Sequence, residues 1–473
     1  MVWQEKILSR ISYERNCPRL VADNTGVLLS AAFTGFLEKR AIPFTIANNH
    51  QELLSASTDL IITALKTIPT FIVRKRVFIE FTFAFLPIDG NTQILKRLSL
   101  ENLVEILDYS DTHSIQYISA ANVDGIVDMA VRSNCRKRAS QIDEWIADLL
   151  QQERNYDNVL KIGFLCGERL YNSFIGQCLP DIEESSVPDN AVMPFWQTEH
   201  YRNTYYLPLS DFKNVDKICP YIKSRNYDKV ALICFDGMGI SEWLLIQEYL
   251  QKKSGLKFLS RPVFSLIPSI THFSRKAVFG APYQDIYTRN LPEDSSLFSS
   301  FFSDRQVRFF REKDSISEDS LLGIDAVGVL YSFIDEISHN IVLPSGTRTK
   351  EIYFKAILEY VKQSSVTATI NLLHSSGFKI FIGSDHGNAL CYGNGHRVEK
   401  YLIDKYSSRA TVGKESVLLE LTELEKVEIP FVADKFAFLA KNRECFAPEG
   451  QVAISHGGLS VEEMVIPFVE VIN

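Results

Sequence analysis

Five short apolar segments in the second half of the chain each end at a residue that can bind a metal ion or act as a nucleophile. The segments and residues are 229–235 with Asp236, 262–268 with Thr271, 328–333 with Asp335 and His339, 378–383 with Asp385 and His386, and 451–455 with His456. Continuous apolar runs that alternate with helical stretches predict a parallel sheet covered on both faces by helices. Ligands of such sheets collect outside the carboxyl ends of the strands, so we expect these residues on one rim.

Three carboxylates and three imidazoles end these segments, which is enough for two metal sites with three ligands each. The adjacent Asp385 and His386 can reach one divalent cation, since a carboxylate and a neutral imidazole form a suitable mixed ligand set. Taken alone, an Asp-His pair at a strand end is more typical of a turn with a capping side chain. The five segments together favour a metal centre.

The length of the chain is sufficient for an enzyme, and its composition indicates an intracellular protein. The 473 residues are 46% hydrophobic, which suits two or three domains with real cores, and the net charge of -8 does not favour non-specific binding to nucleic acid. The eight cysteines form no C-x-x-C pair, which indicates reduced thiols. The N-terminus does not resemble a signal peptide, and the longest apolar run, 77–88, contains Glu80 and is too short to cross a bilayer. We expect a cytoplasmic protein.

Three segments are predicted along the chain. Residues 1–92 form a small α/β domain with a strand, helix and strand over 19–48, in which Asp23 is interpreted as a helix cap. Residues 93–190 form a helical region that ends in a polar linker at 181–190, and its basic run 132–140 is interpreted as a solvated helix face. Residues 191–473 form the domain that contains the five apolar segments, and we expect the candidate metal centre in it.

Five short motifs, in this order along the chain, resemble those of the alkaline phosphatase superfamily: FDGMG, IPSIT, IDEISH, GSDHGN and SHGGLSVEE. The longer words DGMGISEW, PSITHFSRKAVFG and HGGLSVEEMVIPFVEV are similar to the PglZ family within it. The resemblance covers about residues 227–473 and implies an α/β fold with an alkaline-phosphatase-like, mostly parallel sheet flanked by helices.

The resemblance also implies a two-metal site. One metal would be held by Asp236, Asp385 and His386, and the other by Asp335, His339 and His456. Zinc is favoured, with manganese or magnesium as alternatives. Thr271 takes the nucleophile position in preference to Ser269, and metal coordination would favour its alkoxide.

Other residues in and near these motifs are predicted to contact substrate or to support the structure. Arg275, Asn388 and Arg409 are predicted to contact substrate, with an ion pair as an equal alternative for Arg275. His272 and His396 are interpreted as supporting or exposed residues, because the six-ligand set is already complete. Ser460 and Glu463 form the S-x-x-E pattern of a capping box.

Missing motifs narrow the reaction. The chain has no sulfatase C-x-[PA]-x-R sequence and no large insertion of the phosphoglycerate mutase type. Threonine at the nucleophile position resembles the phosphodiesterase and pyrophosphatase branches of the superfamily. The resemblance therefore implies a phosphodiesterase or phosphatase, with the phosphodiesterase favoured, that acts on a nucleotide or oligonucleotide phosphoester. The resemblance further implies a BREX-like phage-defence system with a DNA methyltransferase and an ATPase as partners, and a homodimer is compatible with it. The alternative hypothesis is a catalytically idle scaffold of a defence complex that retains the fold.

Overall fold

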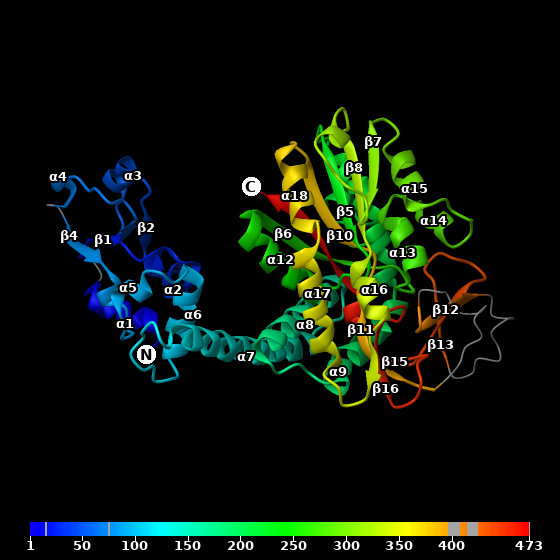
Figure 1. Ribbon diagram of the computed structural model, residues 1–473, viewed down its shortest axis with the longest axis horizontal. Helices are drawn as coiled ribbons and strands as arrows, with labels where there is room; N and C mark the ends of the chain where they lie inside the picture. Colours follow the sequence, from blue (N-terminus) through cyan, green and yellow to red (C-terminus); the bar gives the residue numbers. More distant parts are fainter. Residues whose placement is uncertain (15–16, 74–75, 396–406, 414–423, 473) are drawn as a thin grey trace. The chain divides into compact units, whose positions relative to one another are not determined.

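The computed structural model describes residues 1–14, 17–73, 76–395, 407–413 and 424–472. Within them the chain divides into two compact units, drawn in Figure 1. Unit 1 comprises residues 1–137 and 175–177, and unit 2 comprises residues 138–174 and 178–473. Helix α8 (Tyr156–Gly176) belongs to unit 2 as far as Phe174 and packs closely within it. A Cβ added to Gly163 of α8 would meet Val465 at 2.4 Å, so no larger residue fits there.

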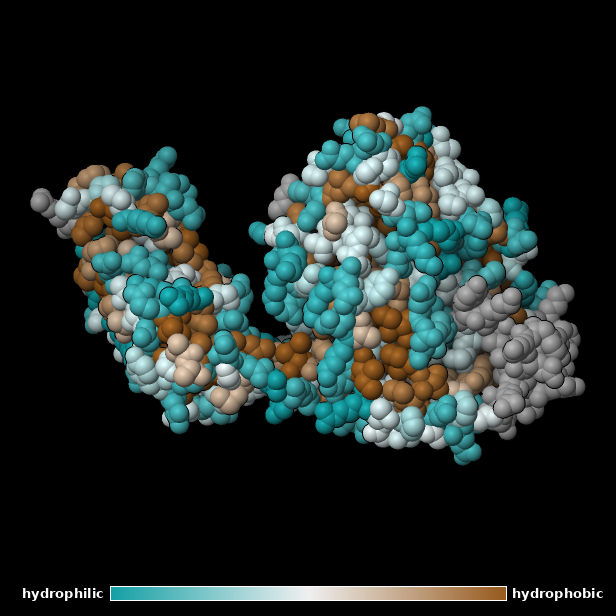
Figure 2. Space-filling model, in the orientation of Figure 1, coloured by the Kyte–Doolittle hydropathy of each residue, from teal (hydrophilic) through white to brown (hydrophobic). Residues whose placement is uncertain are grey.

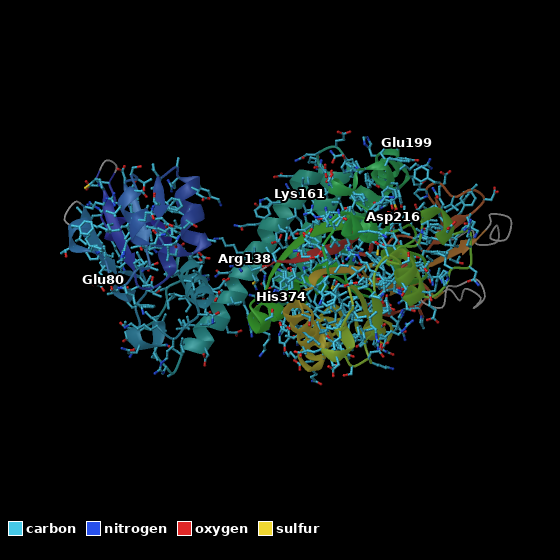
Figure 3. All side chains as sticks on the ribbon, turned by 90° about the horizontal axis from the view of Figure 1, so that it is seen from above. Glu80, Arg138, Lys161, Glu199, Asp216 and His374 are labelled. Atoms are coloured by element: carbon cyan, nitrogen blue, oxygen red, sulfur yellow. The ribbon has the colours of Figure 1, made fainter. Side chains whose placement is uncertain are left out.

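Unit 1 is built on a four-stranded parallel sheet in the order β2-β3-β1-β4. The predicted strand, helix and strand are confirmed as β1 (Arg19–Asp23), α2 (Ala31–Lys39) and β2 (Phe44–Ile46). The Asp23 carboxylate accepts the backbone N–H groups of Thr25, Gly26 and Leu28, so it caps the loop that follows β1. Figure 3 labels Glu80 on β4, where it accepts a hydrogen bond of 2.9 Å from Asn24.

The other elements of unit 1 are α1 (Trp3–Arg10), η1 (Val27–Leu29), α3 (His50–Ser55), β3 (Leu60–Thr63), α4 (Thr70–Val73), β4 (Val77–Phe81), η2 (Phe83–Phe85), α5 (Thr92–Leu95) and α6 (Leu100–Ser110). Helix α7 (Val123–Leu150) contributes residues to both units, since the boundary falls after Lys137. The predicted basic face lies on α7, where Arg132 pairs with Asp128 one turn earlier.

Unit 2 contains a six-stranded sheet in the order β6-β17-β10-β5-β8-β7. Strands β10, β5, β8 and β7 are parallel, and β17 is antiparallel to both β10 and β6. Five of the six strands therefore run in one direction, which confirms the predicted mostly parallel sheet. The strands are β5 (Val230–Phe235), β6 (Lys257–Phe264), β7 (Val307–Arg311), β8 (Ala326–Tyr331), β10 (Lys379–Ser384) and β17 (Val465–Ile472).

Helices cover both faces of this sheet, as the sequence predicts. Alternate residues of β5 enter two different hydrophobic clusters, with Leu232 packed on one face and Ile233 on the other. Helices α11, α13 and α15 contribute to the first cluster, and α12, α17 and α18 to the second. The bounds are α11 (Ile218–Ser224), α12 (Ile240–Ser254), α13 (Thr271–Val278), α15 (Asp294–Phe301), α17 (Thr349–Gln363) and α18 (Val366–Ser375).

Segment 451–455 does not belong to this sheet, so the prediction that all five segments share one sheet is wrong. It forms β16 (Gln451–Ser455), which pairs antiparallel with β11 (Ala389–Gly393) in the order β15-β11-β16-β9. An apolar run alone does not specify its pairing partner. Because β11 directly follows the loop after β10 and Ser455 faces Ala389, His456 still arrives beside His386.

The predicted linker at 181–190 is also wrong. This segment belongs to α9 (Ile182–Val192), which begins with Asp181 as its N-cap and contains Pro188. The polar residue Asp189 is buried because it accepts a hydrogen bond of 2.6 Å from Arg443 and another from the Val461 N–H. A polar and proline-bearing sequence is typical of a linker, but here the Asp189 carboxylate is paired with the buried Arg443.

The remaining elements of unit 2 are η3 (Met193–Gln197), α10 (Glu199–Asn203), η4 (Thr204–Tyr206), η5 (Leu209–Asp211), η6 (Val215–Lys217), α14 (Tyr283–Ile286), η7 (Asp319–Leu321), α16 (Phe333–His339), β9 (Val342–Pro344), β12 (Ala410–Gly413), β13 (Glu425–Glu428), β14 (Phe436–Leu439), β15 (Glu444–Cys445) and α20 (Val461–Met464). Figure 2 shows a surface on which hydrophilic and hydrophobic residues are interspersed. Among the described residues, no helix combines the length and the apolar character needed to cross a bilayer.

Candidate metal centre

Three carboxylates lie side by side at the carboxyl ends of neighbouring strands. Ser384 of β10 pairs with Phe235 of β5, which pairs with Tyr331 of β8, so the residues that follow these strands share one edge. Asp236 and Asp385 follow β5 and β10 directly, and Asp335 lies in the first turn of α16 after β8. The side chains of all three are at most 10% exposed. The parallel register therefore brings together the three carboxylates that the sequence analysis singled out.

The first group of donor atoms belongs to Asp236, Asp385 and His386. One ligand atom from each residue lies within 4.8 Å of the others, and all three residues are buried. Nε2 of His386 is 3.6 Å from Oδ1 of Asp236 and 3.8 Å from Oδ2 of Asp385. This group coincides with the predicted ligands of the first metal, whose role as ligands remains a prediction.

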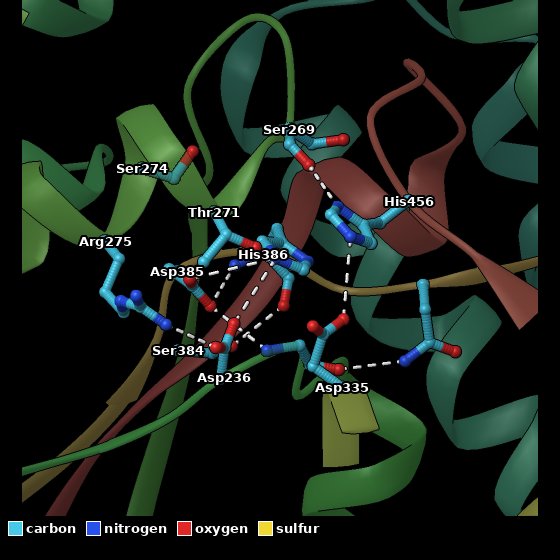
Figure 4. A network of polar contacts seen from close by, with 12 residues as sticks. Asp236, Ser269, Thr271, Ser274, Arg275, Asp335, Ser384, Asp385, His386 and His456 are labelled. Carbon is cyan, nitrogen blue, oxygen red and sulfur yellow. Dashed lines mark hydrogen bonds and ion pairs between the residues drawn. The ribbon is translucent and has the colours of Figure 1, made fainter. Parts of the chain in front are cut away.

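The second group joins Asp335 and His456 to the same His386. Nε2 of His456 lies 3.5 Å from Oδ1 of Asp335, and the rings of His456 and His386 stack with centroids 3.9 Å apart (Figure 4). His339, the predicted third ligand, is not a member of this group. Its Nε2 atom is 3.1 Å from Oδ2 of Asp335, and its side chain is 36% exposed, which places it at the rim of the cluster.

Backbone carbonyls fix which nitrogen of each buried histidine faces the cluster. Nδ1 of His386 is 2.9 Å from the Gly387 carbonyl oxygen, and Nδ1 of His456 is 3.1 Å from that of Ser269. A carbonyl oxygen only accepts hydrogen bonds, so Nδ1 carries the proton in both rings and Nε2 keeps its lone pair. Such contacts orient histidine ligands at metal sites.

Unpartnered buried atoms, shifted pKa values and the mixture of donor types all favour a divalent cation in this cluster. Oδ1 of Asp236, Oδ2 of Asp385 and Nε2 of His456 are buried without a hydrogen-bond partner, although unpartnered buried polar atoms are costly. Burial and the neighbouring Asp385 and Asp335 raise the pKa of Asp236 well above its usual value. Burial and the nearby His386 lower the pKa of His456 to about 4, so its imidazole is neutral at pH 7. Mixed carboxylate and imidazole donors suit zinc and similar ions.

Thr271 places a hydroxyl at the edge of this cluster. It is the first residue of α13, only 4% exposed, and its Oγ1 is 2.8 Å from Nε2 of His386. Ser269 lies differently, since its hydroxyl donates to the Gly458 carbonyl at 2.8 Å and accepts from the Gly457 N–H at 3.1 Å. The Ser269 hydroxyl therefore holds the loop of His456, whereas the Thr271 hydroxyl faces the donor atoms.

Arg275 forms its ion pairs with buried carboxylates beside the cluster and not with carboxylates on the surface. It shares α13 with Thr271, and its guanidinium contacts Asp236 and Asp294, both of which are buried. Burial opposes its charge, but Asp236, Asp294 and Asp385 raise the pKa of Arg275 overall.

The other two predicted substrate contacts are bound to protein groups. The amide nitrogen of Asn388 is 2.8 Å from the Gly237 carbonyl and 2.7 Å from the Tyr353 hydroxyl. Arg409 is 1% exposed and its guanidinium contacts Glu463 and the Glu444 carbonyl. These contacts favour a structural role for both side chains.

The remaining residues of the sequence motifs lie as follows. The capping box of Ser460 and Glu463 is confirmed. His272, beside Thr271, is exposed, and His396 lies outside the described residues.

Sequence analysis missed two residues that act near the cluster. The Ser384 hydroxyl lies within 2.9 Å of the Phe235 and His386 carbonyls and accepts the Met238 N–H, so it ties the ends of β5 and β10 together. Asp294 binds Arg275 from α15, 19 residues away along the chain. An acidic residue at a helix start normally indicates only a favourable helix dipole, so Asp294 gave no distinct signal.

The fold, with candidate metal ligands at the carboxyl edge of an α/β sheet beside a hydroxyl on a helix start, is that of an alkaline-phosphatase-like phosphoesterase. Residues 215–471 match the BREX system PglZ alkaline phosphatase-like domain, and the chain belongs to this PglZ family. No curated protein sequence matches the chain significantly.

Solved structures of distant sequence resemble part of the chain. Murine ectonucleotide pyrophosphatase/phosphodiesterase 5 is 13% identical, with a TM-score of 0.34 over 51% of this chain and 87% of its own. Phosphonoacetate hydrolase from Sinorhizobium meliloti 1021, in complex with phosphonoacetate, is 12% identical, with a TM-score of 0.31 over 51% of this chain and 89% of its own.

Proposed function

We propose that the chain is a two-metal phosphodiesterase or phosphatase of the PglZ type that uses Thr271 as its nucleophile. The observation that carries the proposal is a set of three buried donor atoms without partners, on Asp236, Asp385 and His456, beside the Thr271 hydroxyl. Atoms of this kind are stabilised by a bound cation. A nucleophile beside such a cluster is the arrangement that metal-assisted hydrolysis requires.

Six side chains would hold the two cations. Asp236, Asp385 and His386 would bind one, and Asp335, His456 and the rim residue His339 would bind the other. Zinc is favoured, with manganese or magnesium as alternatives. When bound, the cations would supply Lewis-acid stabilisation of the charge on the nucleophile and on the phosphoryl oxygens.

Thr271 and the start of α13 would orient the phosphate group for attack. Thr271 stands at the start of α13, where free backbone N–H groups favour an anionic phosphate. Its Oγ1 would form a bond to phosphorus while the bond from phosphorus to the leaving alcohol breaks. The leaving oxygen takes up a proton, and the hydroxyl proton of Thr271 is lost. Water then hydrolyses the bond between phosphorus and Oγ1 of Thr271. This restores the hydroxyl and releases a phosphomonoester from a diester substrate or inorganic phosphate from a monoester.

The substrate class and the biological setting are inferred from the family. We propose a nucleotide or oligonucleotide phosphoester, with the diester preferred, and a place in a BREX-like phage-defence system beside a methyltransferase and an ATPase. The net charge of -8 suits a substrate that is held locally at the cluster and not by the whole surface.

Metal content and diester hydrolysis by the full-length protein test the proposal together. The protein is loaded with zinc, the bound metal is counted, and bis-p-nitrophenyl phosphate is compared with p-nitrophenyl phosphate. We expect two metal ions per chain, faster hydrolysis of the diester, and loss of both metal and activity in Asp236→Ala. Protein that binds no divalent ion and hydrolyses neither ester, while it co-purifies with partner proteins, would instead support the scaffold hypothesis.

A further inference from the structure

Arg275 joins two buried carboxylates that come from different parts of unit 2. Nη1 of Arg275 is 2.5 Å from Oδ2 of Asp236, and Nε is 2.9 Å from Oδ2 of Asp294. Figure 4 shows the guanidinium directed at Asp236 from α13. The side chains of Asp236 and Asp294 are 5% and 6% exposed, so both ion pairs are largely shielded from water.

The two oxygens of Asp236 have different surroundings as a result. Oδ2 is bound to Arg275, whereas Oδ1 is buried without a hydrogen bond and lies 3.6 Å from Nε2 of His386. Rotation about the Cβ–Cγ bond of an aspartate exchanges the positions of its two carboxylate oxygens. The contact with Arg275 prevents this rotation, so one oxygen stays directed at the donor atoms of Asp385 and His386.

Asp294 fixes Arg275 in turn. The guanidinium is planar, and a bond to Nε sets the direction in which Nη1 points. Asp294 provides this bond from the start of α15, and its other oxygen is 3.9 Å from Nζ of Lys276. Without Asp294, the long side chain of Arg275 has several rotamers that do not reach Asp236.

We propose that Arg275 and Asp294 are positioning residues that hold Asp236 in the orientation required for metal binding. The inference rests on the proposed function, since it concerns the same cluster, and it replaces direct substrate contact as the main role of Arg275. Residues that orient metal ligands commonly contribute about 10- to 100-fold to metal affinity.

The Arg275→Lys variant separates positioning from simple electrostatics. Arg275 is a cation that repels a metal ion directly, but it also lowers the pKa of Asp236 and so opposes a proton that would compete with the metal ion. Removal of the charge therefore has two opposed effects on zinc binding. A lower zinc affinity in Arg275→Lys, which keeps a cation beside Asp236, indicates lost positioning and not lost charge.

Zinc affinity of the full-length protein, measured by competition with a chromophoric chelator, tests the inference. The variants are Arg275→Gln, Arg275→Lys and Asp294→Asn. Arg289→Gln is the matched control, because Arg289 also pairs with an aspartate, Asp285, but is 70% exposed. We expect Arg275→Gln to weaken zinc binding about 10- to 100-fold. Arg275→Lys keeps the charge but reaches one carboxylate at most, so it also weakens binding, as does Asp294→Asn to a smaller extent. The control binds zinc like the wild type.

Kinetics on bis-p-nitrophenyl phosphate at saturating zinc give the second readout. A positioning role predicts that excess zinc restores much of the activity of Arg275→Lys, with KM close to that of the wild type. Unchanged or stronger zinc binding in folded Arg275→Gln, together with a raised KM, would overturn the inference and assign Arg275 to the substrate. If the wild type itself binds no zinc, the proposed function fails, whereas equal zinc binding by wild type and variants overturns this inference alone.

Discussion

The Thr271 hydroxyl lies 2.8 Å from Nε2 of His386, the imidazole that belongs to both groups of candidate ligands. Because Nδ1 of His386 donates to the Gly387 carbonyl, Nε2 accepts this hydrogen bond from Thr271. The proposed nucleophile is therefore held by the same atom that would bind a cation, and any ion at His386 lies next to the hydroxyl.

This contact predicts different results for two neighbouring hydroxyl residues. Thr271→Ala should lower kcat/KM for bis-p-nitrophenyl phosphate by roughly 10³- to 10⁶-fold, as expected for loss of a nucleophile. Thr271→Ser keeps the hydroxyl and should keep most of the activity. Ser269→Ala should have a smaller effect through His456, whose Nδ1 contacts the Ser269 carbonyl and not the hydroxyl.

Trapping of the covalent intermediate provides the matched measurement. Mass spectrometry of protein quenched during turnover should find an adduct on the peptide that contains Thr271 in the wild type and none in Thr271→Ala. The adduct is a p-nitrophenyl phosphoryl group with bis-p-nitrophenyl phosphate and a phosphate with p-nitrophenyl phosphate. Full activity of Thr271→Ala combined with loss of activity in Ser269→Ala would show that the two roles are reversed.

Zinc should stabilise unit 2 against heat. The unpartnered atoms of Asp236, Asp385 and His456 gain a partner only in the folded state, so binding shifts the equilibrium towards it. The gain is about 2.7 kcal/mol per site when free zinc is about 100 times Kd. Differential scanning calorimetry with zinc and with EDTA measures this shift. In Asp385→Asn the shift should be much smaller, and an equal shift in that variant would place the zinc elsewhere.

Much of this candidate site could be predicted from the sequence, because Asp236 and Asp385 directly follow apolar strands. Strand register alone places Asp236 and Asp385 side by side, so their proximity needed only the prediction of a parallel sheet. Thr271 was separable from Ser269 only through the resemblance to the family. In the structure the two hydroxyls differ, since that of Ser269 is hydrogen-bonded to the loop of His456 and that of Thr271 to His386.

Features that depend on long-range partners could not be predicted. Strand β17 lies between β6 and β10, and nothing in its apolar sequence specifies antiparallel pairing. Asp189, in the predicted linker, is buried by a partner more than 250 residues away, Arg443. The proposed role of Asp294 likewise depends on its contact with Arg275. Local patterns indicate which residues are chemically able to act, but not which distant charge they meet.

Zinc affinity should fall steeply below the pKa of Asp236. Burial and the neighbouring Asp385 and Asp335 raise this pKa well above its usual value, so a proton competes with the metal ion over a wider range than for an ordinary carboxyl group. In metal-free protein the folded state holds this proton more tightly than the unfolded state. The contribution of Asp236 to stability is therefore lost as the pH rises through the raised pKa.

Melting temperatures of the metal-free protein between pH 5 and pH 9 test this sign. The decline towards high pH should be shallower in Asp236→Asn, which does not titrate, and saturating zinc should remove the decline in the wild type. A stability of the metal-free protein that rises steadily with pH in the wild type alone would contradict the assignment.

Gly387→Ala should disrupt the metal centre without a change of charge. A Cβ at this position would lie 2.0 Å from the backbone oxygen of Glu462, so the loop that carries Asp385 and His386 must move. We expect loss of zinc binding in equilibrium dialysis. Gly35→Ala is the control, because no atom lies within 4 Å of an added Cβ there. Zinc binding by Gly387→Ala equal to that of the control would show that the loop tolerates displacement.

Arg409→Met should destabilise unit 2 and not act on substrate binding directly. Arg409 is 1% exposed and pairs with Glu463, the residue that caps the turn after His456. Removal of one member of a buried ion pair costs about 3 to 5 kcal/mol, because the other charge stays buried. Urea unfolding followed by circular dichroism measures this loss. Lys252→Met, which breaks an exposed pair with Glu248, should cost less than about 1 kcal/mol. A variant Arg409→Met with unchanged stability and a strongly raised KM would instead return Arg409 to the substrate contact that its sequence position predicts.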